Sequence, residues 1–339
     1  MREIKFWRRF FQINGGLLIK MGFWNDNKIL VTGGAGFLGS FIVDKLIRER
    51  GVKSENISVP RSEDTDLRIW DNCLKVVEDI DIVIHLAAKV GGIGFNKKYP
   101  GKLFYNNAIM GIQLMEAARQ QNVQKFVTIG TICAYPKFTP VPFKEENLWI
   151  GYPEETNAPY GIAKKVLLVQ AQAYRSQYDF NAIYLLPVNL YGPGDNFDPQ
   201  SSHVIPGLIK KMVDAKLVGE DNVVVWGTGK ASREFLYVED AAEGILLATE
   251  KYNKPDPVNL GVGKEITIRE LVNLIAELTG YNGKIVWDTT KPDGQPRRCL
   301  DTAKAEREFS FSAKTNLSFG LKKTIEWYMQ SKFTAKTIL

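Results

Sequence analysis

The sequence predicts an α/β protein, with a Rossmann-like doubly wound parallel sheet and a smaller C-terminal α/β substrate domain. Three observations predict this fold class. A β-rich run at residues 28–32 leads into a glycine-rich stretch and then an amphipathic helical pattern, the order found in a dinucleotide-binding unit. Strand and helix patterns then alternate as far as residue 186, which predicts a parallel sheet. From residue 195 onward, loops rich in Pro, Asn and Asp replace this alternation.

The change of pattern also divides the chain. It predicts two intimate domains between which the chain crosses more than once, and 339 residues suffice for both. The expected parts are an N-terminal extension (1–22), a dinucleotide-binding Rossmann domain (23–193, with returns at about 234–261), a substrate domain (194–233 and 262–330) and a tail (331–339).

Composition places the chain among ordinary globular proteins, since 45% of its residues are hydrophobic and 24% are charged. Its three Cys, an odd number, argue against a disulfide framework and predict a reducing, cytoplasmic location. With two His and no paired Cys or His spacing, no metal site is expected.

The net charge of +6 is concentrated at the N-terminus. Residues 1–20 carry five Lys or Arg against one Glu, so +4 of the charge lies there and only +2 in the rest. The main body is therefore not expected to bind nucleic acid or a membrane. The basic, apolar segment 1–20 has two interpretations: it lies on a membrane surface, or Met21 is the natural start and the segment is an accessory extension.

In the first half of the chain, short β-rich runs predict the strands, and apolar residues at helical spacing predict the helices. Strands are expected at 28–32, 56–60, 81–86 and 125–129, and helices at 37–50, 68–78 and 103–121.

The glycine-rich stretch is expected to bind the dinucleotide. Its first glycines permit a tight turn, the middle one lets the backbone approach the pyrophosphate, and the last lets the helix pack on the strand. Amides at the start of that helix then face the phosphates. The residues assigned to this contact are Gly33, Gly36, Phe37, Leu38 and Gly39.

The end of the second strand bears on the choice of cofactor. NAD-binding sites usually place an acid there, whereas Arg61 and Ser62 follow this strand, and they suit the 2′-phosphate of NADP(H). Arg61 is otherwise a solvated loop residue. Asp66 is expected either to contact the adenine edge or to cap the helix at 68–78.

The third strand ends in His85, which is expected to be a structural residue. The small residues Ala87 and Ala88 follow it, and their size lets the backbone come close to the cofactor.

Tyr160 and Lys164 form a candidate catalytic pair. Pro159 predicts a helix start, and residues four apart share one helix face. An ammonium beside a phenol favours the phenolate, so Lys164 is expected to lower the pKa of Tyr160 and make it a usable proton donor and acceptor. The pattern is short, and its alternative is a surface Tyr with a solvated Lys.

The second half continues with weaker alternation. We expect a strand at 182–186, a turn-rich exit at 187–194, helices at 204–217 and 268–279, strands at 223–226, 258–260 and 284–287, a helix ending near 252 and two C-terminal helices.

Together these motifs resemble a known family. The generic ones are TGGAGFLG, HLAA and YxxxK, typical of extended short-chain dehydrogenases/reductases acting on nucleotide sugars. More specific are AAKVGGIG, CAYPK, NLYGPGDNFDP, SSHVIP, REFLYVED and KPDGQPRR, and over residues 25–330 the chain resembles the GDP-L-fucose synthase family.

That resemblance implies an NADP-dependent epimerase/reductase. It implies 3,5-epimerisation and 4-reduction of GDP-4-keto-6-deoxy-D-mannose, with Cys133 as the base and His203 as the acid. Tyr160 would protonate the C4 oxygen, Lys164 would hold the nicotinamide ribose, and Thr131 would donate to the sugar oxygen. Ile132 departs from the family, which often has Ser there. A buried, inert Cys133 and a His203 that only neighbours a helix start are the alternatives.

Further residues receive roles through the same resemblance. Asn107 would brace the catalytic segment; Trp226 would contact guanine or else lie in the core; Arg233 with Arg297 or Arg298 would clamp the diphosphate unless they are surface charges. The remaining expected contacts are Pro187, Asn189, Leu190 and His203 with the cofactor, and Lys89, Asn189 and Lys211 with the substrate. The family also implies a homodimer, formed by the helices at 103–121 and 160–178.

Two other functions remain open. One is a 3,5- or 4-epimerase that keeps its nicotinamide bound and returns the hydride. The other is a non-catalytic dinucleotide-sensing relative, against which the complete set of Thr131, Cys133, Tyr160, Lys164 and His203 argues.

Overall fold

The structure is a computed structural model that describes residues 22–291 and 293–337. Residues 1–20, on which both interpretations of the N-terminal segment rest, lie outside the described residues. Among the described helices, none is both long and apolar enough to cross a membrane.

A six-stranded parallel sheet forms the larger part, in the order β2-β1-β3-β4-β5-β9. Each strand is a short apolar run, and most of their side chains are buried. The doubly wound parallel sheet predicted from the sequence is therefore confirmed. The strands are β1 (Ile29–Thr32), β2 (Ile57–Ser58), β3 (Ile82–His85), β4 (Lys125–Ile129), β5 (Ala182–Pro187) and β9 (Val258–Leu260).

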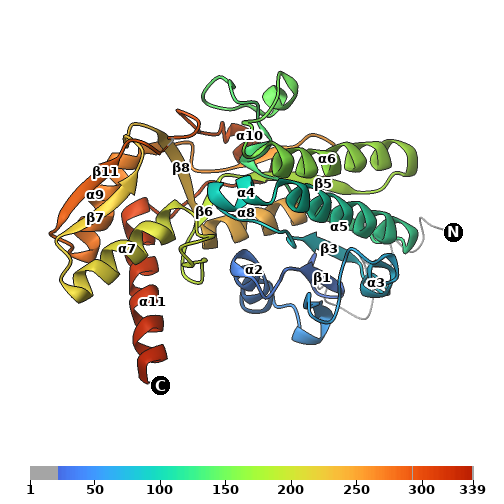
Figure 1. Cartoon of the computed structure of the whole chain (residues 1–339). Coiled ribbons are helices and arrows are strands. Elements are labelled where there is room, and N and C mark those ends of the chain that lie inside the picture. The colour runs from blue at the N-terminus through green and yellow to red at the C-terminus, as the bar shows by residue number, and fades with distance from the viewer. Residues whose placement is uncertain (1–21, 292, 338–339) are drawn as a thin grey trace.

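Helices cover both faces of this sheet. The pair α5 and α6 packs side by side over one face, and α2 packs against α8 on the other (Figure 1). The helices of this part are α2 (Phe37–Arg48), α3 (Trp70–Val76), α4 (Ile93–Lys98), α5 (Pro100–Gln120), α6 (Ala158–Tyr178) and α8 (Val238–Lys251), with 3₁₀ turns at Ser54–Asn56, Ile132–Ala134 and Glu145–Trp149.

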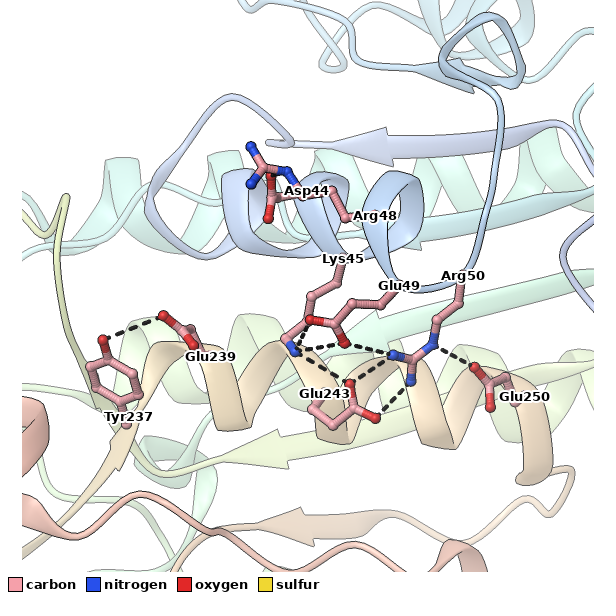
Figure 2. Close-up of polar contacts among 9 residues, drawn as sticks. All are labelled: Asp44, Lys45, Arg48, Glu49, Arg50, Tyr237, Glu239, Glu243 and Glu250. Carbon is pink, nitrogen blue, oxygen red and sulfur yellow. Dashed lines mark hydrogen bonds and ion pairs between the residues drawn. The ribbon is translucent and has the colours of Figure 1, made fainter.

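An ion-pair network joins α2 to α8 (Figure 2). Arg50 Nη2 lies 2.7 Å from Glu243 Oε1, and Arg50 Nε lies 3.0 Å from Glu250 Oε1. Burial disfavours the Arg50 charge, but the hydrogen bonds to these two carboxylates outweigh it, so the pKa of Arg50 is raised. The returning segment is thereby fixed to the first strand–helix unit.

The second part is smaller and has its own hydrophobic cluster, centred on residues of α7 and α9. It lies to the left of the main sheet in Figure 1, and α11 projects from it toward the C-terminus. Its sheets have the orders β10-β8-β6 and β11-β7. Its elements are β6 (Asn189–Tyr191), α7 (Val204–Val218), β7 (Asn222–Trp226), β8 (Ser232–Tyr237), β10 (Glu265–Thr267), α9 (Ile268–Thr279), β11 (Lys284–Asp288) and α11 (Leu317–Thr337). The helix α10 (Ala303–Phe309) belongs to the main part, where it packs against α8 and β9.

Two expectations differ from the observed elements. The segment 187–194 was expected as a turn-rich exit, but Asn189–Tyr191 forms a strand parallel to β8. This strand forms by pairing with β8, which is distant in the sequence. The Pro and Gly residues on either side of it are typical of turns, so the local sequence does not predict a strand. The expected tail at 331–339 overlaps the end of α11, which continues to Thr337.

Candidate active site

Tyr160 and Lys164 lie one turn apart near the start of α6, where Pro159 occupies the first helical turn. Lys164 is only 2% exposed, whereas Tyr160 is partly exposed. Burial raises the pKa of Tyr160, and the nearby Cys133 raises it further. Burial also lowers the pKa of Lys164 to about 8. The prediction that Lys164 lowers the pKa of Tyr160 is therefore wrong, because desolvation dominates both groups.

The segment carrying Cys133 packs directly on this helix. A Cβ at Gly161 would lie 2.3 Å from the Cys133 carbonyl oxygen, so only glycine permits this approach. Thr131 caps the 3₁₀ turn, its Oγ1 accepting the Cys133 N–H at 3.2 Å. Ile132 is 3% exposed and packs in the main hydrophobic cluster, so its departure from the family's Ser is a core contact.

Arg298 lies beside the Cys133 thiol. Its Nη1 is 3.7 Å from Cys133 Sγ, and its Nε donates to Gln295 Oε1 at 2.8 Å. Gln295 is fixed in turn by donating to the Lys137 carbonyl at 2.7 Å. A guanidinium held in this way presents a positive charge to the sulfur and to any anion bound near it.

Arg233 is a second guanidinium in the same area. Burial lowers its pKa to about 10, and the neighbouring positive charge of Arg298 contributes to the shift. Its nitrogens donate to the carbonyls of Ser232 and Asp293, at 2.7 Å and 3.1 Å. Arg297 differs, because it is exposed and forms an ion pair with Glu265. Of the two neighbouring arginines, only Arg298 therefore faces the thiol.

The expected cofactor loops lie against each other. Gly33 has φ +72°, and a Cβ there would lie 3.0 Å from the Ala87 nitrogen. A Cβ at Gly39 would lie 2.1 Å from the Gly33 oxygen, so the last glycine brings α2 onto the turn rather than onto the strand. Gly36 caps α2 without a side-chain hydrogen bond, and Phe37 and Leu38 open the helix. Ala88 follows Ala87 in the facing loop. This close backbone cradle fits a dinucleotide pyrophosphate.

The residues after β2 take different positions. Arg61 is exposed in the turn that follows the strand. Asp66 is ion-paired with Arg68 at 2.6 Å, and hydrogen bonds from Arg68 lower its pKa. The alternative that Asp66 caps the next helix is wrong, since α3 begins at Trp70 with Ile69 as its cap.

Asn107 braces a different loop from the one predicted. Its Oδ1 accepts the Lys89 N–H at 2.9 Å, and its Nδ2 donates to the carbonyls of Lys89 and Leu103. All its polar atoms are thereby used on α5 and the loop after β3. Asn107 was predicted to brace the segment that carries Thr131 and Cys133. It instead binds the backbone of Lys89, whose side chain is exposed.

His203 caps the start of α7, and its side chain is exposed. Protein atoms around the ring nevertheless desolvate it in part and lower its pKa. Within the described residues, no hydrogen bond joins His203 to Cys133, so its place at the sugar stays a prediction. Close to His203, the two domains are joined at Gly92, whose N–H donates to the Ser201 carbonyl at 3.2 Å.

The predicted substrate residues of the second part lie on its surface. Trp226 is 60% exposed, so the alternative of a core Trp is wrong. Lys211 Nζ donates to the Val224 carbonyl at 3.0 Å and lies 6.0 Å from the Trp226 ring, with Lys291 at 5.7 Å. An exposed ring flanked by cations suits a purine carrying phosphates.

Where the chain passes between the domains, Pro187 ends β5, and Asn189 and Leu190 begin β6. Asn189 Nδ2 donates to the Glu234 carbonyl at 3.0 Å. Glu234 itself is completely buried and accepts the N–H groups of Gly263 and Leu300, at 2.7 Å and 2.6 Å.

Glu234 and Gln295 position the site, yet sequence reasoning missed both. Glu234 fixes the chain two residues after Arg298, and Gln295 fixes Arg298 itself. The one available signal was a Glu inside the apolar run of residues 234–238, since a carboxylate in a buried strand needs partners.

Residues 29–261 match the model of the family described as NAD dependent epimerase/dehydratase family, and the chain belongs to this family. The cradle around Gly33 and the Tyr160–Lys164 pair both lie inside the matched residues.

Curated relatives and solved structures show which members of this family the chain is similar to. The chain is 40% identical over 308 residues to GDP-L-fucose synthase 1 of Arabidopsis thaliana, covering 90% of this chain and 94% of the relative. It is 36% identical to GDP-L-fucose synthase of Escherichia coli strain K12, covering 91% and 98%. The crystal structure of a GDP-L-fucose synthetase from Naegleria fowleri bound to NADP superposes with a TM-score of 0.81, at 30% identity over 93% of this chain and 97% of that chain. The resemblance to the GDP-L-fucose synthase family is confirmed.

Proposed function

We propose that the protein converts GDP-4-keto-6-deoxy-D-mannose to GDP-L-fucose by NADPH-dependent 3,5-epimerisation and 4-reduction. The observation that carries the proposal is the packing of the Cys133 segment on the start of α6, beside Tyr160 and with Arg298 at 3.7 Å from the thiol. Similarity to GDP-L-fucose synthases over 90% of the chain supports it.

The chemistry of a 4-keto sugar explains the residue types. The C3–H and C5–H bonds are acidic because the electron pair of each broken bond is delocalised onto the C4 oxygen. Cys133 removes the proton from one face, and His203 returns a proton on the other face, which inverts each centre. Tyr160 donates a hydrogen bond to the C4 oxygen and stabilises the enolate.

Reduction completes the sequence at C4. NADPH, when bound, supplies a hydride to this carbon. Tyr160 gives its proton to the C4 oxygen as the C=O bond becomes a hydroxyl. Lys164 holds the nicotinamide ribose, and Thr131 donates to the same sugar oxygen. NADP(H) rather than NAD(H) is supported by Arg61 after β2 and by the NADP-bound relative from Naegleria fowleri.

The diphosphate and the base are assigned to the cationic residues. Arg233 and Arg298 bind the diphosphate, for which two closely spaced guanidiniums are suited. Lys211 and Trp226 bind guanine, which the exposed ring supports. The division into a Rossmann domain and a substrate domain is supported by two separate hydrophobic clusters.

We also propose a cytoplasmic homodimer. The three cysteines are all free thiols, as a reducing compartment maintains them. The helices α5 and α6 expose apolar residues on their outer surface, among them Phe104, Tyr105 and Val169, and an apolar hollow of about 420 Å³ lies at their N-terminal ends. Light scattering of the purified protein measures the oligomeric state, and Val169→Lys is expected to yield monomers.

One assay tests the activity. Purified protein is supplied with GDP-4-keto-6-deoxy-D-mannose and NADPH, and the cofactor's absorbance is followed. Stoichiometric oxidation with GDP-L-fucose as product supports the proposal. Product without net oxidation identifies the epimerase alternative, and no reaction identifies the non-catalytic one.

A further inference from the structure

The loop at residues 195–203, which ends at His203, is internally cross-linked by its own polar side chains. Asp198 accepts the N–H groups of Gln200 and, through its carbonyl, of Ser201 and Ser202, at 3.0, 3.1 and 2.8 Å. The Ser201 hydroxyl also donates to Asp198 Oδ2 at 2.9 Å and accepts Asn196 Nδ2 at 2.8 Å. These bonds tie residues 196–202 together, and His203 is the next residue along the chain.

Phe197 is the apolar member of this loop, and it stacks on the C-terminal helix. Its ring lies 4.4 Å from that of Tyr328 at an interplanar angle of 17°, and 5.9 Å from that of Trp327 at 28°. Stacked aromatic pairs contribute roughly 0.5–1.5 kcal/mol beyond their buried area. Phe197 thus attaches the loop to α11.

Tyr328 also reaches the helix that follows His203. Its hydroxyl lies 3.2 Å from Asp214 Oδ1 and 3.4 Å from Lys210 Nζ, both on α7. The ring of Tyr328 therefore holds the chain before His203, and its hydroxyl holds the helix after it. Figure 1 shows α7 crossing α11 in the same region.

The other side of the loop contacts the first domain. Gly92 donates to the Ser201 carbonyl at 3.2 Å, and a Cβ on Gly92 would lie 2.8 Å from the Ser202 oxygen. The backbones of the two loops therefore touch immediately before His203. The loop is fixed between the Rossmann domain on one side and α11 on the other.

We infer that Phe197 and Tyr328 are positioning residues for His203, so that the C-terminal helix sets the placement of the acid in the epimerisation. This inference rests on the proposed function. Phe197 and Tyr328 hold the chain on both sides of His203, so its placement depends on these neighbours. Proton return at C3 and C5 is expected to be more sensitive to them than hydride transfer at C4, which depends on Tyr160.

The experiment compares Phe197→Leu and Tyr328→Phe with the control Phe319→Leu. Phe319 is a 53% exposed aromatic on the same helix, and its described ring contact is with Lys323 of that helix. Two quantities are measured: deuterium exchange of the backbone amides at 195–203 by mass spectrometry, and solvent deuterium wash-in at C3 and C5 relative to NADPH oxidation.

Phe197→Leu is expected to speed amide exchange in the loop several-fold and to lower the ratio of wash-in to oxidation about tenfold, a loss worth about 1.4 kcal/mol. The KM for NADPH is expected not to change. Tyr328→Phe keeps the stack and loses the hydroxyl contacts, so its effects are smaller, and Phe197→Tyr restores both quantities. If Phe197→Leu does not fold, Tyr328→Phe still tests the inference against Phe319→Leu.

Equal values for these variants and the Phe319→Leu control would overturn the inference, and so would a loosened loop with an unchanged wash-in ratio. Failure of the proposed function is distinguishable, because the wild-type protein itself would then show no net NADPH oxidation, with or without wash-in. Even without activity, the inference would be overturned if Phe197→Leu did not speed amide exchange at residues 195–203.

Discussion

Two groups of buried cations in this molecule have opposite surroundings. Between α2 and α8, Arg50 is held by the carboxylates of Glu243 and Glu250 (Figure 2). Near the Cys133 thiol, Arg233 and Arg298 donate to carbonyl, amide and sulfur atoms. Within the described residues, neither of these two guanidiniums is hydrogen-bonded to a carboxylate.

The pKa values follow this difference. Carboxylate partners raise the pKa of Arg50, whereas burial lowers that of Arg233 to about 10 and that of Lys164 to about 8. In the first group the protein neutralises its own cation with its own carboxylates. In the second group positive charge is left for an anion from outside, as a nucleoside diphosphate would supply.

The largest expected effect concerns the thiol that these cations face. Cys133→Ser is expected to lower deuterium wash-in at C3 and C5 by about 10²–10⁴-fold, because a hydroxyl is a far weaker base, while NADPH binding is retained. Mass spectrometry of the sugar measures the wash-in. Cys73→Ser, at a completely buried thiol that donates to the Leu67 carbonyl, is the matched control. Unchanged exchange in Cys133→Ser would remove this residue from the mechanism.

The next effect concerns the neutralised group. Arg50→Gln is expected to lower the free energy of unfolding by about 2–3 kcal/mol, because two partly buried carboxylates lose their guanidinium. Within the part of the chain that the structure describes, Glu243 then keeps only Lys45 as a charged partner, and Glu250 keeps only the indole N–H of Trp24. Urea denaturation measures it. Arg48→Gln breaks only an exposed pair with Asp44 and is expected to cost about 0.5 kcal/mol or less. Substrate affinity is expected to stay the same in both, and a change there would show that the two groups are not independent.

At Arg298 we expect substrate affinity to change and stability to stay the same, the opposite of the result expected at Arg50. Arg298→Gln removes a charge that no carboxylate balances, so the free energy of unfolding is expected to be unchanged or slightly raised. The KM for the GDP-sugar is expected to rise by about ten- to a hundredfold, because a charge-assisted hydrogen bond is lost. The neighbouring Arg297→Gln, at an exposed residue paired with Glu265, is the control for both measurements. A loss of stability without a change in KM would show that Arg298 serves the fold, as Arg50 does, and does not bind the substrate.

The smallest effect is a dependence on pH. Burial lowers the pKa of Lys164 to about 8, so its ammonium loses its proton as the pH rises through that value, well before an exposed Lys would. The proposed function requires the ammonium form to hold the ribose, so kcat/KM is expected to fall about tenfold per pH unit above the pKa. A rate profile measured across this range tests it. A profile that stays flat up to the ordinary pKa of Lys would contradict the assigned role.

Much of the fold is readable from the sequence because it is encoded locally. The apolar runs of β1, β3 and β4 and the helical spacing of α6 and α9 each predict their element directly. β6 and β10 are short, and their pairing with β8 defines them, so no local pattern reveals them.

The site divides in the same way. Spacing makes Tyr160 and Lys164 a candidate pair, and the family resemblance adds Cys133. They do not reveal that Arg298 rather than Arg297 faces the thiol, because alternate side chains of an irregular segment are assigned only by its packing. The direction of the Tyr160 shift was missed for a related reason, since burial is a property of the folded molecule.

The pairing of β9 with β5 has a consequence for how the chain is made. During synthesis, residues 185–187 of β5 form an unpaired edge of the sheet until residues 258–260 of β9 have been made and pair with them. Unprotected parallel edges invite mispairing between nascent chains. A pause in synthesis between these two segments would therefore leave that edge open to other nascent chains.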